Sequence, residues 1–178
     1  IGIVIKQDIS ENQARHVLLA IGSNIENRKL NIENAKFLIS KNNDKIIKSS
    51  SYYETESWPN KKFPNYLNVV IKIQTYLRPV MLLQKLKLIE TKLGRKNNFK
   101  NYPRTCDIDI IDYDNQIINL NWSANSLEIP HPRLQYRNFV LLPLFEISKN
   151  WKHPKLNLKI TDLLDKIGIN NLRSIKLI

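Results

Sequence analysis

Two aspartates, Asp107 and Asp109, stand two positions apart in an apolar segment and form the clearest candidate site in the sequence. In an extended strand their side chains project to one face, while Ile108 and Ile110 point to the other. Two carboxylates about 6 Å apart repel by roughly 3 kcal/mol at an effective dielectric constant of about 20, and a bound divalent cation turns this repulsion into attraction. Hard oxygen ligands favour Mg²⁺ or Mn²⁺ over Zn²⁺. The pair therefore predicts a metal site, with two solvated aspartates as the alternative.

A basic loop leads directly into this aspartate segment. It begins at Arg95 and ends at Arg104, and it also contains Lys96 and Lys100. In phosphoryl transfer, a protein mainly positions the reactants and neutralises charge, through metal ions and through Arg or Lys side chains. A carboxylate pair beside a basic loop therefore indicates a polyphosphate substrate. A solvated basic loop without a function is the alternative when the loop is considered alone.

A third candidate is His131, which stands between two prolines and precedes Arg133. Prolines stiffen the backbone and hold the imidazole in one direction, where it could contact a phosphate or a nucleotide base. Arg137 and Phe139 follow at a spacing that could send the cation and the ring to different partners. A lone histidine is more often structural, and Phe139 by composition belongs to the core.

The elements that would position these residues follow from hydrophobic periodicity. Residues 17–21 predict a buried strand, and Gly22-Ser23-Asn24 supplies a turn and helix-capping oxygens before a helix. Residues 46–53 predict a second strand. Residues 66–75 alternate apolar and polar side chains, which predicts a strand covered on one face. Pro79 begins the clearest helix, which has Gly94 near its C-cap, and residues 105–113 predict the last strand.

The resulting order is strand, helix, strand, strand, helix, strand. This βαββαβ order is that of a ferredoxin-like α+β sandwich, in which helices cover one face of a mainly antiparallel sheet. The chain length of 178 residues fits one domain, and 42% of the residues are hydrophobic, enough for a sizeable core. We therefore expect a single domain over residues 1–178.

Composition narrows the class of protein further. The net charge of +12 favours partners that carry phosphate, although AT-rich coding alone would also enrich lysine. Cys106 is the only cysteine, so an intrachain disulfide is excluded and a reducing cytoplasm is expected. The apolar run at residues 1–5 is too short to span a bilayer, and no longer run of that type follows. We expect no membrane partner.

Five separated blocks together resemble the 6-hydroxymethyl-7,8-dihydropterin pyrophosphokinases. The resemblance spans roughly residues 17–147, and it leaves residues 1–15 and 151–178 without an assigned function. The blocks are Ala-Ile-Gly-Ser-Asn at 20–24, Tyr-Leu-Asn at 66–68, Leu-Gly-Arg at 93–95, Pro-Arg-Thr-Cys-Asp-Ile-Asp-Ile at 103–110, and Ile-Pro-His-Pro-Arg at 129–133 continuing to residue 144. Any one block is weak, whereas five blocks in the order of the family are specific.

The resemblance implies transfer of the diphosphate of ATP to the hydroxymethyl group of the dihydropterin, with release of AMP, in folate biosynthesis. It implies two Mg²⁺ ions held by Asp107 and Asp109, with Arg95 and Arg104 assisting the transfer. Implied ATP contacts are Glu90, Arg95, Lys100, Arg104, His131 and Arg137. Implied pterin contacts are Thr55, Trp58, Tyr66, Asn68, Tyr102 and Phe139. Tyr102 replaces a tryptophan that closes over the pterin in many members, so either Tyr102 or Trp58 is expected as the lid aromatic.

Two other functions stay open from the residues alone. A nucleotidyltransferase also combines a Gly-Ser turn with an Asp-x-Asp metal pair, but it keeps the two close in sequence, whereas Gly22 and Asp107 are far apart here. An RNA-recognition domain can share the βαββαβ order and the basic charge, but the expected Lys/Arg-Gly-aromatic strand motif is missing. We therefore expect small-molecule substrates, no nucleic acid, and a monomer, with a place inside a multifunctional folate-pathway protein left open.

Overall fold

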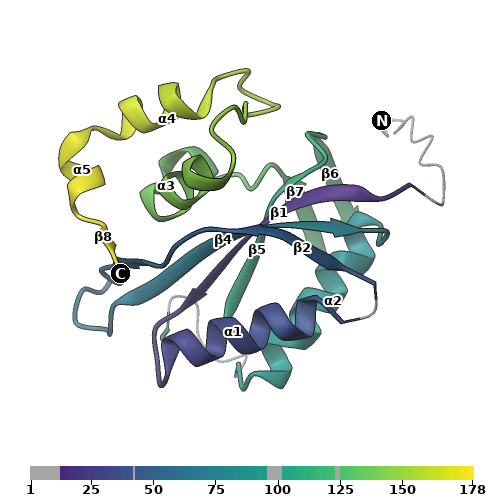
Figure 1. Cartoon of the computed structure of the whole chain (residues 1–178), viewed down its shortest axis with the longest axis horizontal. Helices are drawn as coiled ribbons and strands as arrows, with labels where there is room; N and C mark the ends of the chain where they lie inside the picture. Colours follow the sequence, from purple (N-terminus) through teal and green to yellow (C-terminus); the bar gives the residue numbers. More distant parts are fainter. Residues whose placement is uncertain (1–12, 42, 96–101, 123–124) are drawn as a thin grey trace.

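The computed structural model describes residues 13–41, 43–95, 102–122 and 125–178, and it shows an antiparallel sheet between two layers of helices (Figure 1). The sheet order is β5-β1-β4-β3-β8, and β2 also pairs with β4. Its strands are β1 (Arg15–Ser23), β2 (Lys45–Ser49), β3 (Tyr53–Thr55), β4 (Tyr66–Thr75), β5 (Asp107–Tyr113) and β8 (Lys176–Leu177). The hairpin of β6 (Ile118–Trp122) and β7 (Asn125–Ile129) forms a separate small sheet.

The helices divide between the two faces of the sheet. They are α1 (Arg28–Ile39), α2 (Pro79–Lys92), α3 (Asn138–Ile147), α4 (Ile160–Ile167) and α5 (Ile169–Arg173), with a 3₁₀ helix at Leu134–Tyr136. In Figure 1, α1 and α2 lie below the sheet, and α3 and α4 lie above it. None of the helices among the described residues is long and apolar enough to cross a bilayer.

The sequence correctly predicts the antiparallel sheet and the helix that begins at Pro79. Pro79 occupies the first turn of α2, and Gly94 follows the C-cap with a φ of 84°, a left-handed conformation that glycine adopts without strain. The expected strand at 46–53 is instead split between β2 and β3. The split occurs at Ser50, whose hydroxyl accepts the hydrogen bond of the Val70 backbone N–H.

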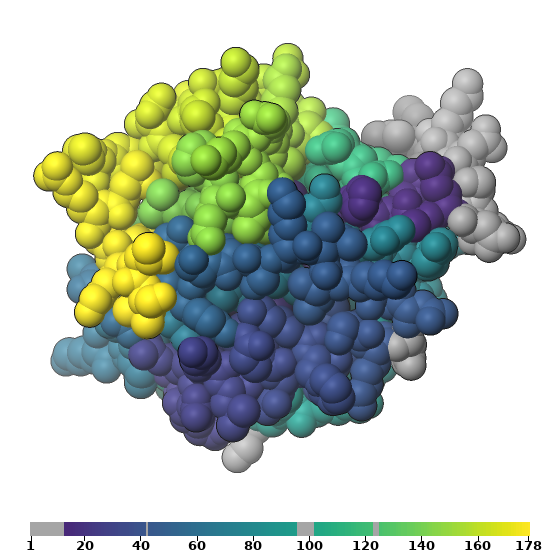
Figure 2. Space-filling model, viewed as in Figure 1, coloured from purple at the N-terminus to yellow at the C-terminus, as the bar shows by residue number. Residues whose placement is uncertain are grey.

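The expectation that helices cover only one face of the sheet is wrong. Side chains of β4 such as Val69 and Ile71 pack in the core below the sheet with α1 and α2. Val70 points the other way, into a second core that includes Leu144 of α3 and Leu163 of α4. β4 is therefore buried on both faces, because the segment after residue 133 folds back over the sheet. Figure 2 shows the segment from α3 to the C-terminus as one continuous body on the surface.

Candidate active site

A pocket of about 470 Å³ lies on the α3 face of the sheet, where β1 ends and β5 begins. Its floor comes from the last residues of β1, its sides from β3, β4 and β5, and one wall from the start of α3 and the C-terminal segment. The predicted residues that line it are Thr55, Trp58, Tyr66, Asn68, Arg104, Asp107, Asp109, Arg137 and Phe139. Residues far apart in the sequence therefore meet in one cavity.

Strand register explains why these residues meet. Gly22 of β1 stands opposite Asn68 of β4 on one side and opposite Asp107 of β5 on the other. A Cβ atom at Gly22 would lie 3.2 Å from Oδ1 of Asn68 and 3.4 Å from the ring of Tyr66. The missing side chain at Gly22 therefore keeps the floor of the pocket open between the amide and the carboxylate.

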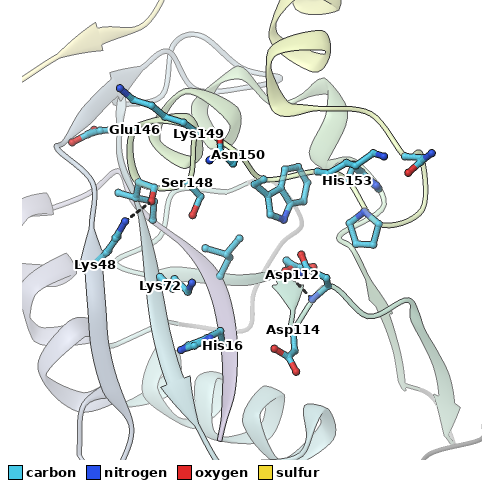
Figure 3. Close-up of a pocket in the computed structure, with 17 residues that line it drawn as sticks. His16, Lys48, Lys72, Asp112, Asp114, Glu146, Ser148, Lys149, Asn150 and His153 are labelled. Atoms are coloured by element: carbon cyan, nitrogen blue, oxygen red, sulfur yellow. Dashed lines mark hydrogen bonds between the residues drawn. The ribbon is translucent and has the colours of Figure 1, made fainter.

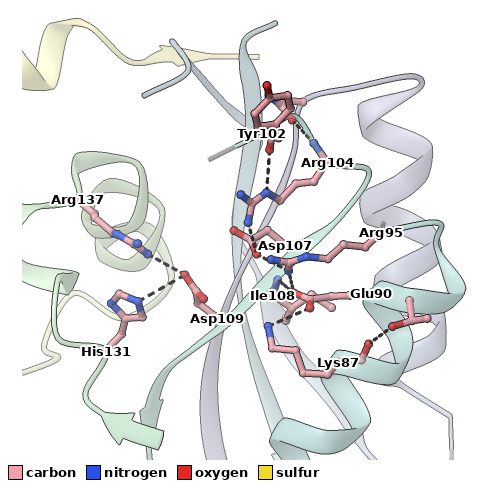
Figure 4. Close-up of polar contacts among 12 residues, drawn as sticks. Lys87, Glu90, Arg95, Tyr102, Arg104, Asp107, Ile108, Asp109, His131 and Arg137 are labelled. Carbon is pink, nitrogen blue, oxygen red and sulfur yellow. Dashed lines mark hydrogen bonds and ion pairs between the residues drawn. The ribbon is translucent and has the colours of Figure 1, made fainter. Parts of the chain in front are cut away.

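Asp107 is held by two arginines (Figure 4). Its Oδ1 lies 2.7 Å from Nη1 of Arg95, at the end of α2, and 3.2 Å from Nη1 of Arg104, in the segment before β5. Burial lowers the pKa of Arg95, but the charges of Asp107 and Glu90 raise it by a larger amount. The net pKa of Arg95 therefore lies above its usual value. The Arg95 guanidinium therefore remains charged beside the carboxylate, as a site for polyphosphate requires.

Asp109 has a different set of partners. Its Oδ2 lies 2.7 Å from Nη1 of Arg137, just before α3, and 3.8 Å from Nε2 of His131. Burial raises the pKa of Asp109, but the charges of His131 and Arg137 lower it by a larger amount. The net pKa of Asp109 therefore lies below the usual range. Burial also lowers the pKa of His131, despite the opposing charge of Asp109. Asp109 is therefore ionised at neutral pH, while burial disfavours the charged form of His131.

Glu90 lies behind Asp107, and only 1% of it is exposed. Its Oε1 lies 2.5 Å from Nη1 of Arg95 and accepts a hydrogen bond from the backbone N–H of Ile108 at 2.7 Å. Its Oε2 lies 2.9 Å from Nζ of Lys87. Burial raises the pKa of Glu90, which the charges of Lys87 and Arg95 oppose. Glu90 thus joins the end of α2 to the first residues of β5 and orients Arg95.

Asn68 and Thr55 form the opposite side of the pocket. Nδ2 of Asn68 donates to Oγ1 of Thr55 at 3.0 Å and to the carbonyl of Tyr53 at 3.3 Å. Because the amide donates toward β3, its carbonyl oxygen faces Gly22 and the pocket floor. Tyr66 also lines the pocket, and burial raises its pKa. This side offers a fixed amide to the edge of a heterocycle.

The aromatic residues occupy different positions. Phe139 lines the pocket at the start of α3, with the guanidinium of Arg137 at 5.6 Å from its ring centroid. Trp58 lines the pocket but is 73% exposed. Tyr102 is 54% exposed, is not among the pocket-lining residues, and packs on Phe63 with ring centroids 5.7 Å apart. Trp58 is thus nearer to the pocket than Tyr102.

Asn24 joins three segments around the pocket, a connection that sequence reasoning missed. Its Oδ1 accepts from the backbone N–H of Arg104 at 2.7 Å, and its Nδ2 donates to Oγ of Ser57 and to the carbonyl of Pro64, each at 3.2 Å. Only 1% of Asn24 is exposed. The sequence indicated a turn and a helix cap here, but α1 is capped by Asn27, whose Oδ1 accepts from Leu30 N. No local pattern reveals a side chain that bonds to loops 33 to 80 residues away.

The described residues suit a hard cation only in part. Asp107 and Asp109 present two carboxylates to the pocket, with side chains 31% and 29% exposed. No group of three or more His, Cys, Asp or Glu side chains suited to a metal occurs in the described part of the chain. Two hard oxygen donors beside a pocket fit Mg²⁺, which keeps several waters and shares substrate phosphates. Lys96 and Lys100 lie outside the described residues.

The chain resembles known proteins in sequence and in structure. A family model described as 7,8-dihydro-6-hydroxymethylpterin-pyrophosphokinase matches residues 18–149. The chain is 39% identical over 165 residues to the folic acid synthesis protein fol1 of Pneumocystis carinii, covering 93% of this chain and 22% of that protein. It is 40% identical over 143 residues to the 2-amino-4-hydroxy-6-hydroxymethyldihydropteridine pyrophosphokinase of Aquifex aeolicus, covering 78% of this chain and 83% of that protein.

A comparison with solved structures shows that this chain shares its fold with a known protein. The crystal structure of a Plasmodium falciparum HPPK-DHPS triple mutant with SDX-DHP superposes with a TM-score of 0.79 at 19% sequence identity, covering 95% of this chain and 48% of that chain. The chain also spans 21% of the folic acid synthesis protein FOL1 of Dictyostelium discoideum. It thus corresponds to about a fifth of those two long relatives and to most of the shorter one from Aquifex aeolicus.

Proposed function

The chain belongs to the 7,8-dihydro-6-hydroxymethylpterin-pyrophosphokinase family, and we propose that it transfers the diphosphate of ATP to 6-hydroxymethyl-7,8-dihydropterin in folate biosynthesis. The observation that carries this proposal is the pocket itself. It combines a charged side, where Asp107 and Asp109 meet three arginines, with a polar side formed by Asn68 and Thr55. A polyphosphate matches the first side and a flat heterocycle with hydrogen-bonding edges matches the second.

We propose that Asp107 and Asp109 hold two Mg²⁺ ions, which when bound neutralise the charge of the phosphate oxygens. Arg95 and Arg104 already lie within 3.2 Å of Asp107, so a polyphosphate that enters beside Asp107 meets both cations. Glu90 fixes Arg95 from behind. These preorganised charges lower the barrier because they require little rearrangement during the reaction.

We propose that the pterin lies on the side of the pocket formed by Asn68 and Thr55, opposite the two arginines that contact Asp107. The Asn68 amide offers both hydrogen-bond polarities, and its donation to Thr55 fixes its orientation. Phe139 offers a ring for stacking, worth roughly 0.5–1.5 kcal/mol beyond area burial. Trp58 is the proposed lid aromatic, because it lines the pocket whereas Tyr102 packs on Phe63. His131, Arg137 and Lys100 are proposed to contribute contacts to ATP.

Three broader features belong to this proposal. The antiparallel order β5-β1-β4 with β2 and β3 beyond β4 supports a ferredoxin-like βαββαβ topology, extended by the layer of α3 and α4. Residues 1–178 are proposed to act as a single monomeric domain, which could also be one unit of a multifunctional folate protein, as the bifunctional Arabidopsis thaliana relative suggests. A free, buried Cys106 supports a reducing compartment such as the cytoplasm.

Turnover with the purified protein tests this function. With Mg²⁺, ATP and 6-hydroxymethyl-7,8-dihydropterin, we expect AMP to form only when the pterin is present, as measured by chromatography of the nucleotides. Omission of Mg²⁺ should abolish AMP formation. Formation of ADP in place of AMP, or of AMP at the same rate without pterin, would contradict the proposal.

A further inference from the structure

A strap of chain at the C-terminus, residues 169–178, borders the candidate active site (Figure 1). This C-terminal strap begins with α5, which contacts α3, and ends with β8, which pairs with β3. Ser174, between α5 and β8, lines the pocket itself. The matched family model ends at residue 149, so the C-terminal strap lies outside the part of the chain that this model covers.

One side chain, Asn138, joins the C-terminal strap to the pocket. Its Nδ2 donates to the backbone carbonyl of Asn171 in α5 at 2.6 Å, and its Oδ1 accepts from the backbone N–H of Phe139 at 2.8 Å. The hydroxyl of Ser174 also donates to the carbonyl of Asn171, at 2.7 Å. Both ends of the Asn138 amide are therefore used, one on the strap and one on the residue proposed to stack on the pterin.

Phe139 depends on this amide more than its neighbours do. In the first turn of α3, the N–H groups of Val140 and Leu141 donate to the carbonyl of Arg137, whereas the N–H of Phe139 donates to the Asn138 side chain. Arg137 is anchored separately, with Nη1 at 2.7 Å from Oδ2 of Asp109 (Figure 4). Loss of the Asn138 side chain should therefore loosen Phe139 and leave Arg137 in place.

The C-terminal end of α3 is held independently by the sheet (Figure 3). Nζ of Lys48 donates to the carbonyl of Ile147 at 3.3 Å, and Oε2 of Glu146 accepts from the hydroxyl of Tyr53 at 2.9 Å. Asn138 therefore governs only the start of α3, which is the end that lines the candidate active site.

The other end of the C-terminal strap is held on the side of the pocket opposite Phe139. There β8 pairs with β3, the strand that ends at Thr55. Oγ1 of Thr55 in turn accepts from the amide of Asn68. The strap thus reaches from the wall that carries Phe139 to the wall that carries Thr55 and Asn68, the two walls proposed to contact the pterin.

We propose that Asn138 is a positioning residue for the pterin, and that it acts by tying Phe139 to the C-terminal strap. Stacking of two flat rings depends on their offset, so a ring that moves loses part of its attraction for the heterocycle. The phosphate side is not affected, because Arg137 stays bound to Asp109. Asn138 has this role only if the pocket takes the pterin, so the assignment rests on the proposed function.

Calorimetric titration with 6-hydroxymethyl-7,8-dihydropterin, in the presence of Mg²⁺ and a non-hydrolysable ATP analogue, tests this role. Asn138→Ala removes the hydrogen bonds to Asn171 and Phe139, and the Kd for the pterin should rise about threefold to tenfold. The Kd for the ATP analogue should not change. Equal losses for both ligands would show a general loss of structure and contradict the positioning role.

Asn138→Ser separates the two hydrogen bonds. A serine hydroxyl can still accept from a neighbouring backbone N–H, but its side chain is one atom shorter and does not reach the carbonyl of Asn171. The pterin affinity of Asn138→Ser should therefore fall as it does in Asn138→Ala. Unchanged affinity in Asn138→Ser would show that only the bond to Phe139 matters, and it would overturn the role of the C-terminal strap.

Two variants serve as matched controls. Asn171→Ala removes the hydrogen bond from its Nδ2 to the carbonyl of Ile167, but it keeps the backbone carbonyl that Asn138 binds. Lys48→Ala removes the tie at the other end of α3. Neither should alter the Kd for the pterin. A loss of pterin affinity in either control as large as that in Asn138→Ala would overturn the proposal.

The unaltered protein distinguishes a failure of this role from a failure of the proposed function. If the unaltered protein does not bind the pterin, the proposed function is refuted and the role of Asn138 with it. If the unaltered protein and Asn138→Ala bind the pterin equally well, only the role of Asn138 is overturned. Thermal unfolding checks that each variant folds, and Asn138→Ser provides the measurement if Asn138→Ala does not.

Discussion

The two ends of β5 carry aspartates in opposite electrostatic situations. At the start of the strand, Asp107 and Asp109 face arginines, and the pKa of Asp109 lies below its usual range. At the end of the strand, burial raises the pKa of Asp112 to about 6, although the Asn115 N–H and Trp151 oppose the rise. The same residue type on one strand is therefore kept ionised at one end and penalised for ionising at the other.

The difference arises from the segments that reach each end. Arg95, Arg104 and Arg137 come from the end of α2, the segment before β5 and the segment before α3, and all converge on the first aspartates. At the other end, no lysine or arginine of the described residues pairs with Asp112. Cations supplied by loops make the first end a site for anions.

The largest effect is expected from the first end. Asp107→Ala or Asp109→Ala should lower turnover by about a thousandfold or more, because each removes a proposed metal ligand. The matched control is Asp114→Ala, which removes a carboxylate paired with Arg15 far from the pocket. Steady-state rates with ATP and pterin measure this, and circular dichroism checks the fold. Rates within tenfold of the unaltered protein would refute the metal assignment.

The second prediction concerns the other end and its pH dependence. Because the folded-state pKa of Asp112 lies above the unfolded value of about 3.8, ionisation in the folded state costs stability. This cost is absent below pH 4 and complete above pH 6. The free energy of unfolding of Asp112→Asn relative to that of the unaltered protein should therefore increase as the pH rises from 4 to 6, by up to about 3 kcal/mol in total.

Urea unfolding at pH 4, 5 and 7.5 measures this gain. Asp109→Asn is the matched control with the opposite sign, since a lowered folded-state pKa stabilises the protein above the unfolded pKa and loses this contribution as pH falls. A stability difference for Asp112→Asn that does not change with pH would contradict the contrast between the two ends.

The third prediction tests whether Asn24 holds the loop segments in position at the Asp107 end of β5. Asn24→Ala removes the hydrogen bonds to Arg104 N, Ser57 and Pro64, so the substrate segments should lose their relative positions. We expect kcat to fall roughly tenfold to hundredfold. Asn27→Ala is the control, because it removes only the cap of α1 and should cost about 1 kcal/mol of stability with little change in kcat. Equal kcat losses in both variants would show that Asn24 stabilises the fold without positioning the substrate segments.

The smallest effect concerns the C-terminal segment, which also contributes Ser174 to the pocket. β8 pairs with β3, the strand that ends at Thr55, and the backbone N–H of Ile178 donates to Tyr52 O at 2.9 Å. Ile178→Pro removes this hydrogen bond, and the KM for pterin should rise roughly twofold to fivefold. In Leu177→Pro the lost N–H points away from β3, so the KM should not change. Equal KM changes in the two variants would argue against the contact with β3.

The sequence predicts the parts of this site that depend on local pattern. The two-residue spacing of Asp107 and Asp109, the alternation of β4 and the Pro and Gly boundaries of α2 are all visible in neighbouring residues. The antiparallel sheet was predicted correctly on this basis. Family resemblance then supplied roles for Asn68 and His131 that neither residue reveals alone, and these roles stay predictions.

What could not be predicted depends on contacts between distant segments. Whether an arginine faces Asp107 or Asp109 depends on where helices and loops end in space. Likewise, the side-chain hydrogen bonds of Asn24 join residues up to 80 positions apart in the sequence. The second helical layer was missed because the alternation of β4 is equally compatible with solvent or with a helix above its other face. Asp112 shows the same limit, since its raised pKa follows from burial beneath the segment after α3.

The most direct test of the central claim follows the phosphorus atoms of ATP. In separate reactions with [α-³²P]ATP and [β-³²P]ATP, the account predicts that the β label appears in the pterin product and the α label appears only in free AMP. Asp107→Ala should abolish both signals. An α label attached to the pterin would identify a nucleotidyltransferase, and the absence of any label in the pterin product would contradict the proposed activity.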